Sequence, residues 1–198
     1  MLHTVIFIGR SGCGKGTQAD LLKEYIREHD ADKRHLLYVE TGEHFRRLIR
    51  QDNYSAKLAL EVHERDERQP DFLACSMWGK ILIEELDENM HIIFDGAPRA
   101  IDEAHVLTTA MKFYKREKPT IIYLDVSRRW SEDRLLARRR MDDRGIAHID
   151  KRLNWFDADT LPALEYFKSD PFYRVLEING EQEIDKVHSD IVEAYSSR

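Results

Sequence analysis

Cysteine is scarce in this sequence, with only Cys13 and Cys75 among its 198 residues. The two lie far apart and neither belongs to a C-x-x-C pair, which excludes both a zinc knuckle and a framework of disulfides. We therefore expect no zinc. Such cysteine usage is typical of a protein of the reducing cytoplasm.

Positive charge is also in short supply. The chain has 31 lysines and arginines against 37 aspartates and glutamates, which gives a formal net charge of −6. A uniformly basic surface that binds polyanions is thereby excluded, so no nucleic acid partner is expected. Any site for an anion has to be built locally from a few groups.

Long hydrophobic runs are missing as well. Apolar stretches such as 5–8 and 121–124 have the length of β-strands, whereas a membrane-spanning helix needs about 20 apolar residues. The first residues do not resemble an export signal, so we expect a cytoplasmic protein with no membrane contact. With 42% hydrophobic residues and no repeat or low-complexity linker, the chain is predicted to form a single domain over 1–198.

What the sequence does contain is an alternation of short β-branched runs with helical periodicity. Strands are predicted at 4–8, 36–39, 92–94, 121–126 and 173–178. Between them, apolar residues recur at helical spacing, as in 21–26, 45–49 and 78–82. Buried strands joined by helices require right-handed crossovers. The predicted fold is therefore α/β, a five-stranded parallel sheet with helices on both faces.

Polar residues follow these strands at the edge where such sheets bind ligands, outside the carboxyl ends of the strands. They occupy 9–17 after the first strand, 41–43 after the second, 95–99 after the third, and Asp125 at the end of the fourth. We expect these four strand ends to meet at one site.

The first of these segments, GRSGCGKGT over 9–17, has the spacing of a phosphate-binding loop. In such a loop, backbone N–H groups at the start of a helix surround phosphate oxygens, and a lysine adds a mobile charge. The alternative, a tight turn that binds nothing, is disfavoured because four glycines, a lysine and a preceding strand occur together. The sequence predicts a nucleotide phosphate site at Gly12, Gly14, Lys15, Gly16 and Thr17.

Gly16 stands where such loops usually carry Ser or Thr directly after the lysine. Without that hydroxyl, Mg²⁺ is expected to be held by nucleotide phosphates and water, with a nearby carboxylate orienting the water. Asp95 is the candidate for that carboxylate.

The segments GKGTQ at 14–18, TGE at 41–43, DGAPR at 95–99 and RMDD at 140–143 occur in this order. The ordered set resembles the adenylate kinases and related nucleoside-monophosphate kinases over nearly the full chain. The resemblance implies reversible transfer of the γ-phosphoryl group of Mg·ATP to a nucleoside monophosphate, and we expect a monomer. It also implies a core over 1–40, 73–138 and 153–198, a helical acceptor-binding insertion over 41–72, and a short lid over 139–152.

Physical reasoning supports the same reaction, because an anionic phosphate acceptor needs position and positive charge and no general base. Arginine suits this task because its planar fork matches phosphate oxygens. By resemblance, Arg134 covers the donor base beside the phosphate-binding loop, and the catalytic residues are Lys15, Arg99, Arg138, Arg140 and Arg152. The same resemblance implies an acceptor site formed by Thr41, Gly42, Arg46, Gly96, Arg99 and Glu103.

The arginine-rich run over 128–144 has simpler interpretations, a solvated helix face or a nucleic-acid patch. We interpret Arg128, Arg129 and Arg144 as solvated, whereas the other arginines take a site role only through their match to the family. Asp142 and Asp143 are a turn or a helix cap, or, as the resemblance favours, residues that close the lid. The nine histidines show no ligand spacing and are interpreted as structural or surface residues.

Glu103 departs from the family pattern at a position that affects which acceptor base is bound. Adenylate kinases usually carry a glutamine there that reads adenine, whereas an ionised carboxylate only accepts hydrogen bonds and suits the N1–H and amino group of guanine. Glu103 has two further interpretations, a protonated carboxyl in a dry pocket or a surface residue turned to solvent. Thr41 matches the AMP-using members of the family. AMP is therefore the preferred acceptor and GMP the alternative.

A nucleotide-binding switch that holds ATP without transferring it is an alternative of another class. Such a protein needs the phosphate-binding loop but no second phosphate site. Arg46 and Arg99 supply that second site, so the sequence favours a transferase.

Overall fold

Five strands form one parallel sheet in the computed structural model, which describes residues 2–65, 67–138 and 146–197. The strand order is β2-β3-β1-β4-β5. The strands are β1 (Thr4–Gly9), β2 (Leu36–Glu40), β3 (His91–Asp95), β4 (Thr120–Asp125) and β5 (Arg174–Asn179). The predicted sheet is confirmed, and each strand end lies within about one residue of its prediction.

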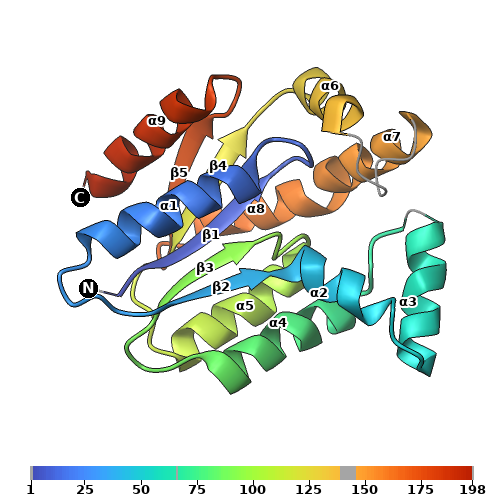
Figure 1. Cartoon of the computed structure of the whole chain (residues 1–198), viewed down its shortest axis with the longest axis horizontal. Helices are drawn as coiled ribbons and strands as arrows, with labels where there is room; N and C mark the ends of the chain where they lie inside the picture. The colour runs from blue at the N-terminus through green and yellow to red at the C-terminus, as the bar shows by residue number, and fades with distance from the viewer. Residues whose placement is uncertain (1, 66, 139–145, 198) are drawn as a thin grey trace.

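Helices cover both faces of this sheet (Figure 1). Val5 and Phe7 of the central strand pack with α1 (Lys15–His29) and α9 (Ile184–Ser196). Ile6 and Ile8 point to the other face, where they pack with α4 (Asp71–Glu85), α5 (Ile101–Phe113) and α8 (Leu161–Ser169). Because alternate residues of a strand face opposite sides, burial on both faces requires the unbroken apolar run of β1.

The remaining helices lie beyond the carboxyl edge of the sheet. They are α2 (Thr41–Leu48) and α3 (Tyr54–Glu64) before α4, and α6 (Arg128–Arg138), α7 (Ile146–Trp155) and the π-helical turn η1 (Phe156–Thr160) before α8. The predicted insertion thus contains α2 and α3, and α3 projects past the sheet (Figure 1). The Asn53 side chain caps α3 by accepting a hydrogen bond from the Ala56 N–H at 2.8 Å. Of the predicted lid, 139–145 lie outside the described residues.

A polar cluster closes the opposite, amino-terminal end of the sheet. His91 is buried, its Nδ1 accepts a hydrogen bond from the His3 N–H at 3.0 Å, and its Nε2 lies 3.2 Å from Oδ2 of Asp30. Burial lowers the pKa of His3 to about 4, so this ring is neutral at physiological pH. These contacts agree with a structural role for both histidines. Across the described residues, no helix has the length and apolar character needed to cross a membrane.

Candidate active site

A cleft of about 1140 Å³ opens at the carboxyl edge of the sheet. Its walls come from the loop before α1, from α2, the 67–69 linker, the end of β3, α5, α6 and α7. The predicted site residues that line it are Gly12, Gly14, Lys15, Gly16, Thr17, Thr41, Gly42, Arg46, Asp95, Gly96, Arg99, Glu103, Arg134 and Arg152. The side chain of Arg138 and all of Arg140 lie outside the described residues. Apart from Asp125 at the end of β4, the structure therefore brings together the predicted site residues that it describes.

The loop between β1 and α1 turns through left-handed glycines. Gly12 and Gly14 have φ of 86° and 98°, a conformation that side-chain-bearing residues rarely adopt. Nζ of Lys15 donates to the carbonyls of Gly9 at 2.7 Å and Arg10 at 3.0 Å, so the ammonium lies across its own loop. The first turn of α1 presents free N–H groups and the positive end of the helix dipole. Together these groups can bind an anion.

Asp95, the last residue of β3, lies against this loop. A Cβ on Gly16 would lie 3.3 Å from Oδ2 of Asp95, tighter than an ordinary contact, so glycine at 16 gives the carboxylate its room. The Tyr38 hydroxyl donates to the same oxygen at 3.1 Å. Burial and the negative charge of Asp95 raise the pKa of Tyr38, which keeps that hydroxyl protonated. The Thr41 hydroxyl donates to the Asp95 carbonyl at 3.3 Å and ties the ends of β2 and β3 together.

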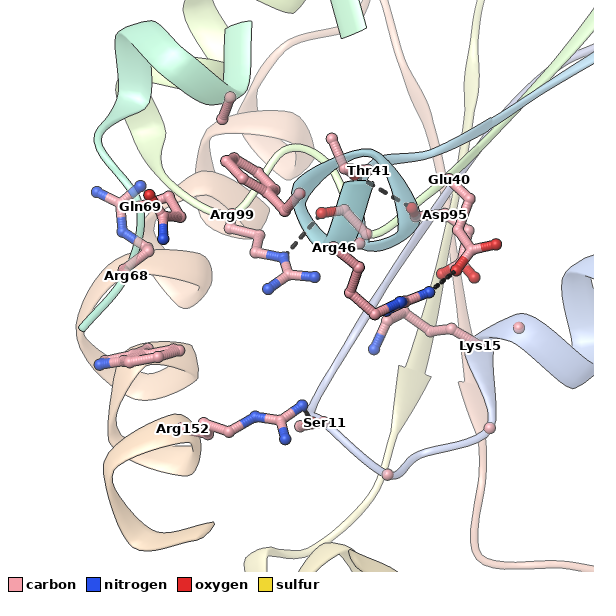
Figure 2. Close-up of a pocket in the computed structure, with 18 of the residues that line it drawn as sticks. Ser11, Lys15, Glu40, Thr41, Arg46, Arg68, Gln69, Asp95, Arg99 and Arg152 are labelled. Carbon is pink, nitrogen blue, oxygen red and sulfur yellow. Dashed lines mark hydrogen bonds and ion pairs between the residues drawn. The ribbon is translucent and has the colours of Figure 1, made fainter. Parts of the chain in front are cut away.

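Two arginines face the loop across the cleft. Arg46 on α2 places Nη2 2.9 Å from Oε1 of Glu40, and both side chains are partly exposed. Nε of Arg99 donates to the Gly96 carbonyl at 2.8 Å, which orients the guanidinium while leaving its side chain exposed to the cleft. Figure 2 shows both arginines and Lys15 around one space. Their charges can bind a second phosphate group opposite the first.

Helices α6 and α7 supply further cations. Nη2 of Arg152 on α7 donates to the Ser11 hydroxyl at 2.8 Å and so reaches the phosphate-binding loop (Figure 2). On α6, the Arg134 guanidinium carbon lies 4.7 Å from the ring centroid of Trp130, a cation–π contact that holds the guanidinium at the wall of the cleft.

Glu103 lies in the first turn of α5 and is 2% exposed. Its Oε1 lies 3.2 Å from Nη1 of Arg68, and the same Nη1 also pairs with Asp71. Nε of Arg68 lies 3.3 Å from Oδ2 of Asp159. Burial raises the pKa of Glu103 to about 7, although the charges of Arg99 and Arg68 oppose this. The interpretation of Glu103 as a surface residue turned to solvent is therefore wrong.

Two other interpretations are corrected by the structure. The Asp125 carboxylate accepts from the Tyr123 hydroxyl at 2.7 Å, because residues two apart on a strand share a face. It does not line the cleft. Three strand ends meet at the site, not four. Arg128 is not simply solvated, since it pairs with Glu132 at 3.0 Å and with Asp150 at 2.9 Å and joins α6 to α7.

Sequence reasoning missed several residues of the cleft wall, namely Ser11, Tyr38, Glu40, Arg68, Gln69 and Trp155. Ser11, Tyr38 and Glu40 adjoin motifs that were recognised, so their positions carried a usable signal. The 67–69 linker belongs to no motif, and only Pro70 before the start of α4 marks it.

Comparison with known proteins decides the family. The sequence profile of adenylate kinase matches residues 7–171. The chain belongs to the adenylate kinase family. An adenylate kinase of Flavobacterium psychrophilum is 32% identical over 200 residues, covering 97% of this chain and 98% of that protein. An adenylate kinase of Azobacteroides pseudotrichonymphae is 31% identical over 196 residues, covering 98% and 96%.

A more distant relative, adenylate kinase 1 of a Nostoc species, is 29% identical over 183 residues and covers 92% of this chain and 93% of its own. The resemblance inferred from the ordered motifs is thus confirmed. As a member of the adenylate kinase family, the chain is a nucleoside-monophosphate kinase, a phosphotransferase that uses ATP.

Proposed function

We propose that the chain transfers the γ-phosphoryl group of Mg·ATP reversibly to AMP, so that ATP and AMP become two ADP. The supporting observation is that one cleft brings together two groups of cations, each able to bind a phosphate. Lys15 and the loop form the first, and Arg46 and Arg99 form the second. A donor and an acceptor phosphate held opposite each other need only alignment and charge compensation to react.

The acceptor oxygen is already anionic, so no residue has to remove a proton. Lys15 exchanges its loop carbonyls for phosphate oxygens of ATP, and Arg46 exchanges Glu40 for the acceptor phosphate. Arg99 and Arg152 then contact the phosphoryl group in transfer. Charges fixed in advance stabilise the transition state because they need not reorganise as the reaction proceeds.

Mg²⁺ fits this cleft through a single protein carboxylate. Asp95 adjoins the phosphate-binding loop at Gly16 and presents the hard oxygen ligand that Mg²⁺ prefers. Within the described ranges, no group of three or more His, Cys, Asp or Glu could hold a metal ion. Phosphate oxygens and water would therefore be its main ligands, with Asp95 orienting the water. When bound, the ion neutralises charge on the phosphates.

We also propose that 41–72 is the acceptor-binding insertion and 139–152 the lid. Arg46 on α2 and Arg152 on α7 support this division, because the two segments bring cations to the cleft from opposite sides (Figure 2). Arg138 and Arg140 keep their proposed catalytic roles beside them. A cytoplasmic monomer stays our prediction.

GMP is a second candidate acceptor, favoured by one observation. The Glu103 carboxyl is buried in the wall of the cleft, and a carboxylate there matches the two donors of guanine and mismatches N1 of adenine. Such a mismatch costs about 1–3 kcal/mol.

The test is phosphoryl transfer from Mg·ATP to AMP, GMP, CMP and UMP, with the nucleoside diphosphates separated and quantified. At neutral pH we expect AMP to react fastest, GMP next, and the pyrimidine nucleotides slowest. A GMP rate well above the AMP rate would contradict AMP as the acceptor. ATP binding without transfer to any of the four would support the nucleotide-binding switch instead.

A further inference from the structure

Part of the cleft lies beyond Arg46 and Arg99, on the side away from Lys15. Figure 2 shows Gln69 and Arg68 on the side of Arg99 that faces away from Lys15. Phe45 of α2 and Ile49, which follows that helix, contribute apolar surface to the cleft, and Glu103 contributes a buried carboxyl. Apolar walls with a few polar groups are what a flat heterocyclic base requires.

The side chains in this part that can hydrogen-bond a purine include the Gln69 amide and the Glu103 carboxyl, and of these two only the carboxyl changes its donor and acceptor pattern with pH. The Arg68 side chain donates a hydrogen bond to Oε1 at 3.2 Å, and the Arg99 backbone N–H also bonds the carboxyl. A carboxylate has about four lone-pair sites, so these two donors leave it able to accept from a ligand. The protonation state of a carboxyl group decides which ligand that is. A neutral carboxyl offers one O–H donor and one carbonyl acceptor, whereas a carboxylate offers acceptors only.

Adenine and guanine present opposite patterns along the same edge. Adenine has an acceptor at N1 beside an amino donor, which a neutral carboxyl matches in the way that an amide does. Guanine has an N1–H donor beside an amino donor, which a carboxylate matches with both oxygens. We infer that Glu103 selects the acceptor base through its own protonation, with the neutral form taking AMP and the ionised form taking GMP. This inference rests on the proposed function and deepens it.

Titratable groups from every neighbouring element surround Glu103. Arg68 in the linker, Asp71 on α4 and Arg99 after β3 act on its charge directly. The neutral Cys75 thiol on α4 also faces it, Asp102 precedes it on α5, and Asp159 on η1 pairs with Arg68. Burial favours the neutral form, and Arg99 and Arg68 favour the ionised form. Arg68 is shared among three carboxylates, which weakens its hold on any one of them. Both forms of Glu103 are therefore populated near neutral pH.

Binding of the acceptor adds one more charge. Its phosphate neutralises Arg99, one of the two cations that stabilise the Glu103 carboxylate. Acceptor binding therefore stabilises the neutral carboxyl relative to the carboxylate. AMP is favoured at neutral pH, and the rate with GMP rises relative to that with AMP as the pH increases.

The experiment compares kcat/KM for AMP and for GMP with the full chain at saturating Mg·ATP, from about pH 6 to about pH 8.5. The two acceptor phosphates titrate alike, so their effect cancels in the AMP-to-GMP ratio. The ratio then follows the ratio of neutral to ionised Glu103, and we expect it to fall at least about tenfold over this range. A ratio that changes less than about twofold overturns the inference.

Glu103→Gln supplies the matched variant, since an amide keeps one donor and one acceptor at every pH. We expect its ratio to favour AMP and to stay constant with pH. Glu193→Gln, on the exposed side of α9, removes the same charge away from the cleft and is expected to keep the wild-type slope. A Glu103→Gln chain that keeps the slope overturns the inference, and the wild-type profile decides alone if that variant does not fold.

Arg68→Met removes a cation from Glu103 and is a second, independent variant. Without Arg68 the neutral form of Glu103 persists to higher pH, so the decline of the ratio should move upward in pH. A decline that moves downward contradicts the role assigned to Arg68. Absence of transfer to any nucleotide at any pH would overturn the proposed function as well, whereas transfer with a constant ratio overturns only the inference about Glu103.

Discussion

Replacing Lys15 with alanine is expected to lower kcat/KM for phosphoryl transfer about 10³-fold, a loss of about 4 kcal/mol of transition-state stabilisation. The Lys15 ammonium lies across the phosphate-binding loop at the start of α1 and contacts the carbonyls of Gly9 and Arg10. We propose that phosphate oxygens replace these carbonyls when ATP binds. The measurement is steady-state kinetics with ATP varied at saturating acceptor.

Folding has to be separated from chemistry in this variant, because Lys15→Ala also removes two hydrogen bonds within the loop. Their net contribution to stability is about 1 kcal/mol each, so thermal unfolding should shift by a few degrees and remain cooperative. Lys186→Ala removes a lysine from an exposed ion pair with Asp190 and should leave both rate and stability nearly unchanged. A Lys15→Ala chain with rates within about tenfold of wild type would contradict the role of this loop.

Replacing Arg99 with alanine is expected to lower kcat/KM for the acceptor about 10²- to 10³-fold while changing the affinity for ATP less than about threefold. Arg99 is anchored to Gly96, on the side of the cleft opposite the loop, where we propose that the acceptor phosphate binds. Kinetics with the acceptor varied, together with ATP binding by calorimetry, measure the two effects separately.

Arg99→Lys sharpens this test, because it keeps the charge and removes the planar fork. We expect most of the loss to remain, since an ammonium cannot hold two phosphate oxygens in one plane. Arg27→Ala, which breaks an exposed ion pair with Glu24 on α1, is the matched control. Equal losses of ATP affinity and rate in Arg99→Ala would favour a protein that binds ATP without transferring it.

The elements that sequence reasoning placed correctly are those with local causes. The run VIFI in β1 is apolar at every position because both faces of the strand are covered, and such a pattern is visible without knowing what covers them. The phosphate-binding loop is equally local, since its glycines and Lys15 all lie within residues 9–16. Ordered motifs then placed Arg46, Arg99 and Asp95 at the same cleft.

The residues that escaped prediction depend on partners distant in sequence. Tyr38 meets Asp95 across 57 residues, and Arg68 meets Glu103 across 35. Neither pair has a spacing that helical or strand periodicity would reveal. The burial of Glu103 could not be predicted from local sequence either, because a glutamate in the first turn of a helix is ordinarily solvated. Only packing of α4 and α5 against the linker removes it from water.

A single bisubstrate experiment tests the two-site cleft most directly. A ligand made of two adenosines joined through several phosphates should bind in a crystal structure, with one ligand in the cleft of each protein molecule. Its phosphates should run from Lys15 to Arg46 and Arg99, with one base at Arg134 and the other beside Glu103. A ligand held by the phosphate-binding loop alone, with its second base in solvent and the arginine side of the cleft filled by protein, would contradict the account.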